Sequence, residues 1–284
     1  MSGPQAVRRF RAMGCRSTVI VEAGDVDVQR LAELAMIRIA RLEAAWSTFL
    51  PDSDVSRLNR AAGAPVTVRP ATVELLKAMV EATVVSAGAY DPTVPGHRPD
   101  ETPWFEAVAI DPDGATVQAD RRLCFDPGGI GKGLAADLVV ADTMASGASA
   151  VAIFLGGDGR VSSDDGLRRW AIEVAAPDGT TSIDRLELDR GAVATSGCRR
   201  AHLVDPVTGR IVEPGEVVQV SVLAGTGATA EALTKAVLLG GDPHAVDRLD
   251  DQGIGVLALR ADGRTTANAT WGDHRALSAA GAVA

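Results

Sequence analysis

The segment that runs from Asp126 to Asp137 combines residue types that suit the binding of a phosphate group. It reads Asp-Pro-Gly-Gly-Ile-Gly-Lys-Gly-Leu-Ala-Ala-Asp, so four glycines, one lysine and two carboxylates stand where a helix is predicted to begin. Glycines let backbone N–H groups approach an anion, a helix N-terminus adds partial positive charge, and Lys132 supplies a cation. The residue order excludes a P-loop and a dinucleotide-binding fingerprint. The sequence therefore predicts an anion site of a less common type.

The residues around this segment predict helices and strands that alternate without a regular βαβ period. Helical spacing is found at about 27–46, 55–59, 70–87, 131–146, 228–239 and 243–250. Short strands are expected within 104–125 and at 16–22, 150–155, 168–175, 183–189, 192–195, 201–204, 217–224 and 254–260. This irregular order favours an α+β fold over a doubly wound sheet. We expect one domain over 1–284, with its core at about 8–260, built from mixed or antiparallel sheets with flanking helices.

Composition narrows the class of protein. Hydrophobic residues make up 46% of the 284 residues, which excludes global disorder. The formal charge is -9, and the basic runs do not exceed the pairs Arg8-Arg9 and Arg199-Arg200, so nucleic acid is not expected as a partner. Three cysteines without a Cys-x-x-Cys spacing predict reduced thiols. No segment has the pattern of a signal peptide or a membrane span, so we expect a cytoplasmic protein with no membrane partner.

Other blocks of polar residues stand between glycines and prolines at the ends of apolar runs. Taken alone, each has a structural explanation as a turn or a strand end. Their order along the chain is more informative. The blocks are Ala12-Met13-Gly14, Glu43-x-x-Trp46-Ser47, Ser53-x-x-Ser56-Arg57-Leu58-Asn59, Ala89-Tyr90-Asp91-Pro92-Thr93, the glycine segment, Leu155-Gly156-Gly157-Asp158, Ala194-Thr195-Ser196-Gly197 and His202-x-x-Asp205-Pro206-x-Thr208-Gly209. With this ordered set the chain resembles the ApbE family of flavin transferases from about residue 8 to 260.

The resemblance implies a FAD:protein FMN transferase with a single α+β domain. Such an enzyme binds FAD, uses Mg²⁺ to stabilise charge on the diphosphate, and passes FMN to a Thr or Ser hydroxyl of a client protein with release of AMP. By position, the residues that match flavin-nucleotide contacts of the family are Met13, Phe49, Ala89, Tyr90, Asp91, Asp126 and Lys132. Phe49 and Tyr90 would offer ring faces to the ligand, with a packed loop anchor as the alternative for Phe49.

Two further positions belong to the expected site. His202 matches the family's histidine and is the candidate general base toward the acceptor hydroxyl; the alternative is that it contacts phosphate or the neighbouring strand. Thr195 and Ser196 are expected to add hydroxyl or N–H donors near the same anion.

One helix departs from the family's pattern. The resemblance implies a metal site made by the carbonyl of Gly129 and by an Asp and a Thr four residues apart, but those two positions hold Glu231 and Lys235. This pair is an ordinary surface ion pair, or Lys235 replaces the metal, or Lys235 turns away while Glu231 and Thr234 keep a weakened ion. The functional alternatives are a flavin transferase, a non-transferring FAD-binding protein and an FAD pyrophosphatase. The transferase would be either metal-dependent or modified, with Lys235 joining His202 in catalysis.

Overall fold

The centre of the protein is a large antiparallel sheet. The computed structural model describes residues 3–93, 103–111, 113, 116–164, 166, 168–197, 204–206, 209–212, 215–239 and 245–276. In these residues eight strands run in the order β1-β2-β6-β7-β10-β11-β12-β13, and every neighbouring pair is antiparallel. Their bounds are β1 Gln5–Ala12, β2 Cys15–Glu22, β6 Ala150–Leu155, β7 Asp158–Ser163, β10 Gly191–Gly197, β11 Val217–Ala224, β12 Gly255–Arg260 and β13 Thr265–Ala267.

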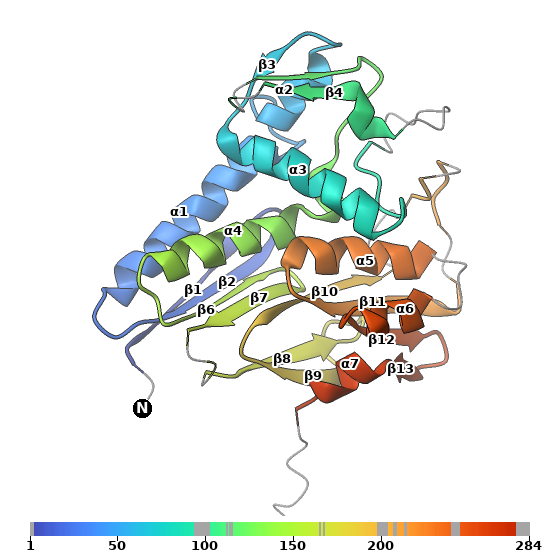
Figure 1. Ribbon diagram of the computed structural model, residues 1–284. Coiled ribbons are helices and arrows are strands. Elements are labelled where there is room, and N and C mark those ends of the chain that lie inside the picture. The colour runs from blue at the N-terminus through green and yellow to red at the C-terminus, as the bar shows by residue number, and fades with distance from the viewer. Residues whose placement is uncertain are drawn as a thin grey trace, which may run out of the picture.

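Helices cover one face of this sheet, and a hairpin covers part of the other (Figure 1). The covering helices are α1 Val28–Trp46, α4 Gly131–Ala145, α5 Gly227–Leu239 and α6 Ala245–Asp251. The hairpin is made by β8 Trp170–Ala175 and β9 Ser182–Leu188, with the short helix α7 Ala269–Asp273 beside it. The expected α+β fold is confirmed.

Strand β6 shows why its sequence is apolar at every position. Successive side chains of a strand point to opposite faces, so each face receives alternate residues. Val151, Ile153 and Leu155 belong to the core under α1 and α4, whereas Ala150 and Ala152 pack with the hairpin side. The central strand is therefore buried on both faces.

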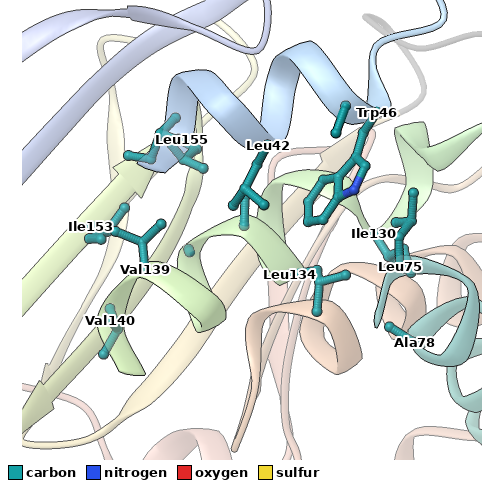
Figure 2. Packing of buried hydrophobic residues seen from close by; sticks show 14 of the residues in the cluster. Leu42, Trp46, Leu75, Ala78, Ile130, Leu134, Val139, Val140, Ile153 and Leu155 are labelled. Atoms are coloured by element: carbon teal, nitrogen blue, oxygen red, sulfur yellow. The ribbon is translucent and has the colours of Figure 1, made fainter. Parts of the chain in front are cut away.

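The helix-side core also fixes the direction of α4. Leu42 and Trp46 of α1 lie above Leu134 and Val139 of α4, and Ile153 of β6 closes the cluster from the sheet (Figure 2). These side chains recur at helical spacing on α1 and α4, so burying one face of each helix sets its orientation. The N-terminus of α4 is thereby held at the end of the sheet where β6 and β7 meet.

A smaller layer caps this end of the molecule (Figure 1). It contains helices α2 Asp54–Arg60 and α3 Pro70–Val85, the 3₁₀ turn η2 Trp104–Ala107, and a three-stranded sheet in the order β3-β5-β4. The three strands are β3 Val66–Thr67, β4 Val108–Ile110 and β5 Thr116–Ala119. Asp54 joins the elements of this layer, because its buried carboxylate accepts hydrogen bonds from Thr72 and from the N–H of Arg69.

Most predicted elements are present, with differences at particular places. Residues 104–107 form a 3₁₀ turn instead of a strand. Strands β1, β3, β7 and β13 and helix α7 were not predicted. The strand expected at 201–204 lies largely outside the described residues, and Val204 makes an isolated bridge to Ile211. None of the helices in the described ranges is long and apolar enough to cross a membrane.

Candidate functional site

The glycine segment forms a 3₁₀ turn that leads into α4. The turn, η3 Pro127–Gly129, begins at Asp126, whose N–H donates to the carbonyl of Pro92 at 2.7 Å and whose Oδ1 accepts the N–H of Gly128 at 2.8 Å. Helix α4 starts two residues later, so Lys132 lies in its first turn. The predicted helix N-terminus is therefore present, and its first turn carries a lysine.

Lys132 is the centre of a buried ionic cluster. Its ammonium forms ion pairs with Glu231 of α5 and, at 2.7 Å, with Oδ2 of Asp158 at the start of β7. The carboxylate side chains are almost fully buried, with 2% exposure for Glu231 and 7% for Asp158, while 29% of the lysine side chain stays exposed. The second oxygen of Glu231 accepts the backbone N–H of Gly133 at 2.9 Å. Three elements that are distant in sequence thus meet at one cation.

A close contact between two glycines makes this meeting possible. A Cβ on Gly133 would lie 2.2 Å from the carbonyl oxygen of Gly227, so α4 and the start of α5 touch backbone to backbone. Asp137, one turn further along α4, accepts the N–H groups of Gly227 and Ala228 at 2.7 and 3.0 Å. These are free donors at the first turn of a helix, so Asp137 caps α5 and holds Glu231 opposite Lys132.

The second half of the site lies one turn along α5. Lys235 is 14% exposed at its side chain and donates to the backbone carbonyl of Glu231 at 2.8 Å, with its Nζ 3.9 Å from Oε1. Thr234 is fully buried and shares a 2.7 Å hydrogen bond with Ser196 of β10. The N–H of Thr195 donates to Oδ1 of Asp158 at 3.0 Å, which connects this strand to the lysine cluster.

Burial and mutual attraction shift the pKa values of this cluster in opposite directions. Burial by itself would lower the pKa of Lys132, but the carboxylates of Glu231 and Asp158 outweigh it and raise that pKa well above its ordinary value. Burial would raise the pKa of Glu231, yet the two lysines lower it. For Lys235, burial lowers the pKa and the charge of Lys132 adds to that effect, against the attraction of Glu231. Glu231 is therefore a firmly ionised anion shared by two lysines.

Two cavities open on either side of Lys132. The smaller, about 250 Å³, is lined by Met13, Trp46, Phe49, Asp126 and their neighbours, and the larger, about 850 Å³, reaches from Cys15 to Thr195, Ser196 and Lys235. Gly128 and Lys132 belong to both linings. The site is thus elongated, with its cation near the middle. This shape suits a ligand whose negative charge lies between two larger groups.

The comparisons with known proteins identify the family of the chain. The sequence profile of the ApbE family matches residues 13–258. The chain belongs to the ApbE family. No curated protein sequence matches this ApbE chain. Its fold is shared by the ApbE protein of Thermotoga maritima, with 25% identity over 96% of this chain and 100% of the other and a TM-score of 0.84.

Two solved flavin transferases have the same fold as this ApbE chain. The flavin transferase ApbE from Vibrio cholerae is 24% identical over 95% of this chain and 99% of its own, with a TM-score of 0.77. The apo form of the flavinyl transferase ApbE from Pseudomonas stutzeri is 22% identical over 96% and 97%, with a TM-score of 0.79.

The structure places the family-matched residues at different distances from the cavities. Met13 occupies the tight turn between β1 and β2 with a positive φ of 50°, and Phe49 stands at the smaller cavity with 94% of its surface exposed. The loop-anchor alternative for Phe49 therefore fails, because an anchor would be packed. Asp126 and Lys132 line the same cavity.

Tyr90 and its neighbours lie behind the glycine segment. The Tyr90 ring is 4% exposed, and a Cβ on Gly129 would lie 2.4 Å from its Cε2, so the ring packs under Gly129 and lines neither cavity. Asp91 is half-buried and accepts both the N–H and the hydroxyl of Thr93 at 2.7 Å. Ala89 precedes them on the same turn. In this structure the Tyr90 ring supports the glycine segment, and a ring face on Tyr90 is not free for a flavin.

His202 lies outside the described residues, so its role as a base stays a prediction. Two residues with site geometry received no role from the sequence, namely Asp158 and Trp46. Asp158 carried a signal, because it ends the Gly156-Gly157-Asp158 block, but a turn explained that block equally well. Trp46 lines the smaller cavity, and its Nε1 is buried without a hydrogen-bond partner in the described residues.

The side-chain oxygen atoms that α5 offers for magnesium already have partners within the protein. In the part of the chain that the structure describes, no group of three His, Cys, Asp or Glu side chains is placed to hold a metal. Glu231 is bonded to Lys132 and Gly133, and Thr234 is fully buried against Ser196. The pair does not lie on a solvated helix face, because Glu231 is buried and only 14% of the Lys235 side chain is exposed.

Proposed function

We propose that the protein is a FAD:protein FMN transferase, which moves FMN from FAD to a Thr or Ser hydroxyl of a client protein and releases AMP. The position of Lys132 between the two cavities is the observation that supports this proposal. FAD has two nucleotide halves joined by a diphosphate, so an elongated site with a central cation matches its charge distribution.

The proposed step exchanges one phosphorus–oxygen bond for another. The acceptor hydroxyl oxygen forms a bond to the phosphorus of the FMN half, and the bond between that phosphorus and the bridging oxygen breaks. AMP leaves with the bridging oxygen, and the hydroxyl proton passes to a base, for which His202 is our candidate. Such transfers depend mainly on positioning and on offsetting negative charge.

The chain's own residues supply both requirements. Lys132 lies in the first turn of α4, where we expect the diphosphate to bind, and Glu231 and Asp158 keep that ammonium fixed. Phe49 at the mouth of the smaller cavity offers an exposed ring for the isoalloxazine. Thr195 and Ser196 face the larger cavity on the other side.

The test is an incubation of the purified protein with FAD and a client domain that carries an acceptor threonine. Fluorescent FMN bound covalently to the client, with one AMP released per label, is the expected result. A client with valine at the acceptor position is the matched control and should stay unlabelled. A Lys132→Met variant should lose labelling, because the carboxylates and the ligand's diphosphate then repel each other.

A second candidate function is FAD binding without transfer. It is favoured by Lys235, since a lysine offsets charge as a single point and does not bridge two phosphate oxygens as a metal does. Tight FAD binding with neither AMP release nor a labelled client would establish this candidate. AMP release without labelling would instead indicate an FAD pyrophosphatase.

A further inference from the structure

Both oxygens of the carboxylate expected to bind magnesium already have partners within the protein. One oxygen of Glu231 pairs with the ammonium of Lys132, and the other accepts the N–H of Gly133. The side chain is 2% exposed. A metal ion would therefore have to displace a buried lysine or break a hydrogen bond at the mouth of α4 before it gained this ligand.

The other oxygens on α5 are engaged too. The backbone carbonyl of Glu231 accepts hydrogen bonds from Lys235 at 2.8 Å and from Thr234 at 2.7 Å. The hydroxyl of Thr234 is fully buried and also bonds Ser196 at 2.7 Å. The backbone carbonyl of Glu231 and the hydroxyl of Thr234 are therefore both engaged within the protein.

The charges around this position also oppose a metal. The cluster holds two ammonium groups, Lys132 and Lys235, and two carboxylates, Glu231 and Asp158. A divalent ion beside Glu231 would stand close to both ammonium groups and would be repelled by them. Lys235 lines the larger cavity and uses one of its three donors on the Glu231 carbonyl, so its remaining donors are available to an anionic ligand.

We propose that this site binds the diphosphate of FAD without a divalent metal ion, because the ammonium groups of Lys132 and Lys235 occupy the position and supply the charge of the metal. The proposal rests on the proposed function in one respect, namely that FAD is the ligand. The residues that distinguish this site from a magnesium-dependent site lie on α4 and α5 of this chain.

The deciding experiment uses the wild-type protein and needs no variant. FAD affinity is measured by quenching of flavin fluorescence in excess EDTA and again in millimolar Mg²⁺. We expect the two dissociation constants to agree within about twofold, because the proposed site binds the diphosphate without the ion. Calorimetric titration of Mg²⁺ into the protein without FAD should show no binding. A tenfold or larger gain in FAD affinity with Mg²⁺ would overturn the proposal.

Variants test the role of Lys235 itself. Lys235→Met should weaken FAD binding at least about tenfold in EDTA, as expected for loss of a charge-assisted contact. Lys77→Met is the matched control, because Lys77 is an exposed lysine paired with Glu74 on α3, and it should bind FAD like the wild type. The double variant with Lys235→Thr and Glu231→Asp should gain affinity for FAD when Mg²⁺ is added.

The outcomes separate this proposal from the proposed function. If the wild type binds FAD in Mg²⁺ but loses it in EDTA, metal independence is wrong and FAD as the ligand stands. If the wild type binds FAD in neither condition, the proposed function is wrong. If Lys235→Met is folded, as verified by circular dichroism, and its FAD affinity is unchanged, then Lys235 does not contribute to FAD binding.

Discussion

Replacement of Gly133 by alanine tests the contact on which the site depends. Alanine favours a helix over glycine by up to about 1 kcal/mol, so at an open position the substitution would stabilise α4. At Gly133 the new Cβ would stand 2.2 Å from the carbonyl oxygen of Gly227 and 2.7 Å from the N of Ala228. Both neighbours are backbone atoms, so no side chain can rotate away. We therefore expect Gly133→Ala to destabilise the protein.

The size of the effect follows from the movement required. Real Cβ contacts essentially never fall below 3.0 Å, so α4 and α5 must separate by about 0.8 Å. Overpacking of this kind typically costs about 1–3 kcal/mol, and here it also stretches the bond from the Gly133 N–H to Glu231. We expect a net loss of about 2–3 kcal/mol. For a chain of this size that corresponds to a fall in Tm of roughly 3–5 °C.

The assay is thermal and urea denaturation of the variant beside a matched control. Gly225→Ala is that control, because Gly225 precedes α5 and no heavy atom lies within 4 Å of its added Cβ. It should leave stability unchanged or raise it by about 0.5 kcal/mol. A Gly133→Ala protein as stable as the wild type would refute the backbone contact between the two helices, and with it the account of how Glu231 reaches Lys132.

Two further predictions concern single side chains. Tyr90→Phe should leave the free energy of unfolding unchanged or raise it by about 1 kcal/mol in urea denaturation, because the Tyr90 hydroxyl is buried without a partner in the described ranges. A decrease in the free energy of unfolding would contradict this prediction. Burial would raise the pKa of Asp184, but hydrogen bonds from Trp271 and Arg275 outweigh it and lower that pKa, so the ionised form stabilises the fold above the unfolded value of 3.8. Asp184→Asn should then be less stable than the wild type at pH 7, with a difference that shrinks as the pH falls below 3.8; a constant difference would refute the assignment.

The sequence predicted the helices and strands that are buried along one whole face or on both faces. Helix α1 repeats apolar residues at helical spacing, and β6 is apolar throughout, so both could be recognised locally. Strand β1 could not, because Arg8, Arg9 and Arg11 interrupt its alternation on an edge of the sheet. Strand β7 begins with Asp158 and Gly159 and carries few apolar residues, and its strand character comes from its pairing with β6.

The candidate site likewise has one part that the sequence predicted and one part that it did not. The phosphate-binding character of the segment around Lys132 follows from residue types and local spacing, since a helix mouth is a local structure. The partners of Lys132 could not be predicted in this way, because Glu231 is 99 residues away in sequence and Asp158 lies on strand β7. Spacing showed that Glu231 and Lys235 share one face of a helix. It did not show that this face is buried, which the contact between Gly133 and Gly227 brings about.

Charge balance connects the lysine cluster to the choice between transfer and binding. The two ammonium groups of the cluster are already paired with two carboxylates, so the charge that they supply to a bound diphosphate is shared with Glu231 and Asp158. Binding is still favoured, because Lys132 and Lys235 can share their remaining donors with phosphate oxygens. Transfer needs more, since leaving-group charge develops on AMP and must be met by a group that strengthens its contact there. A ratio of AMP release to FAD binding that rises in the double variant, when Mg²⁺ is supplied, would show that the wild-type lysine favours holding the nucleotide over cleaving it.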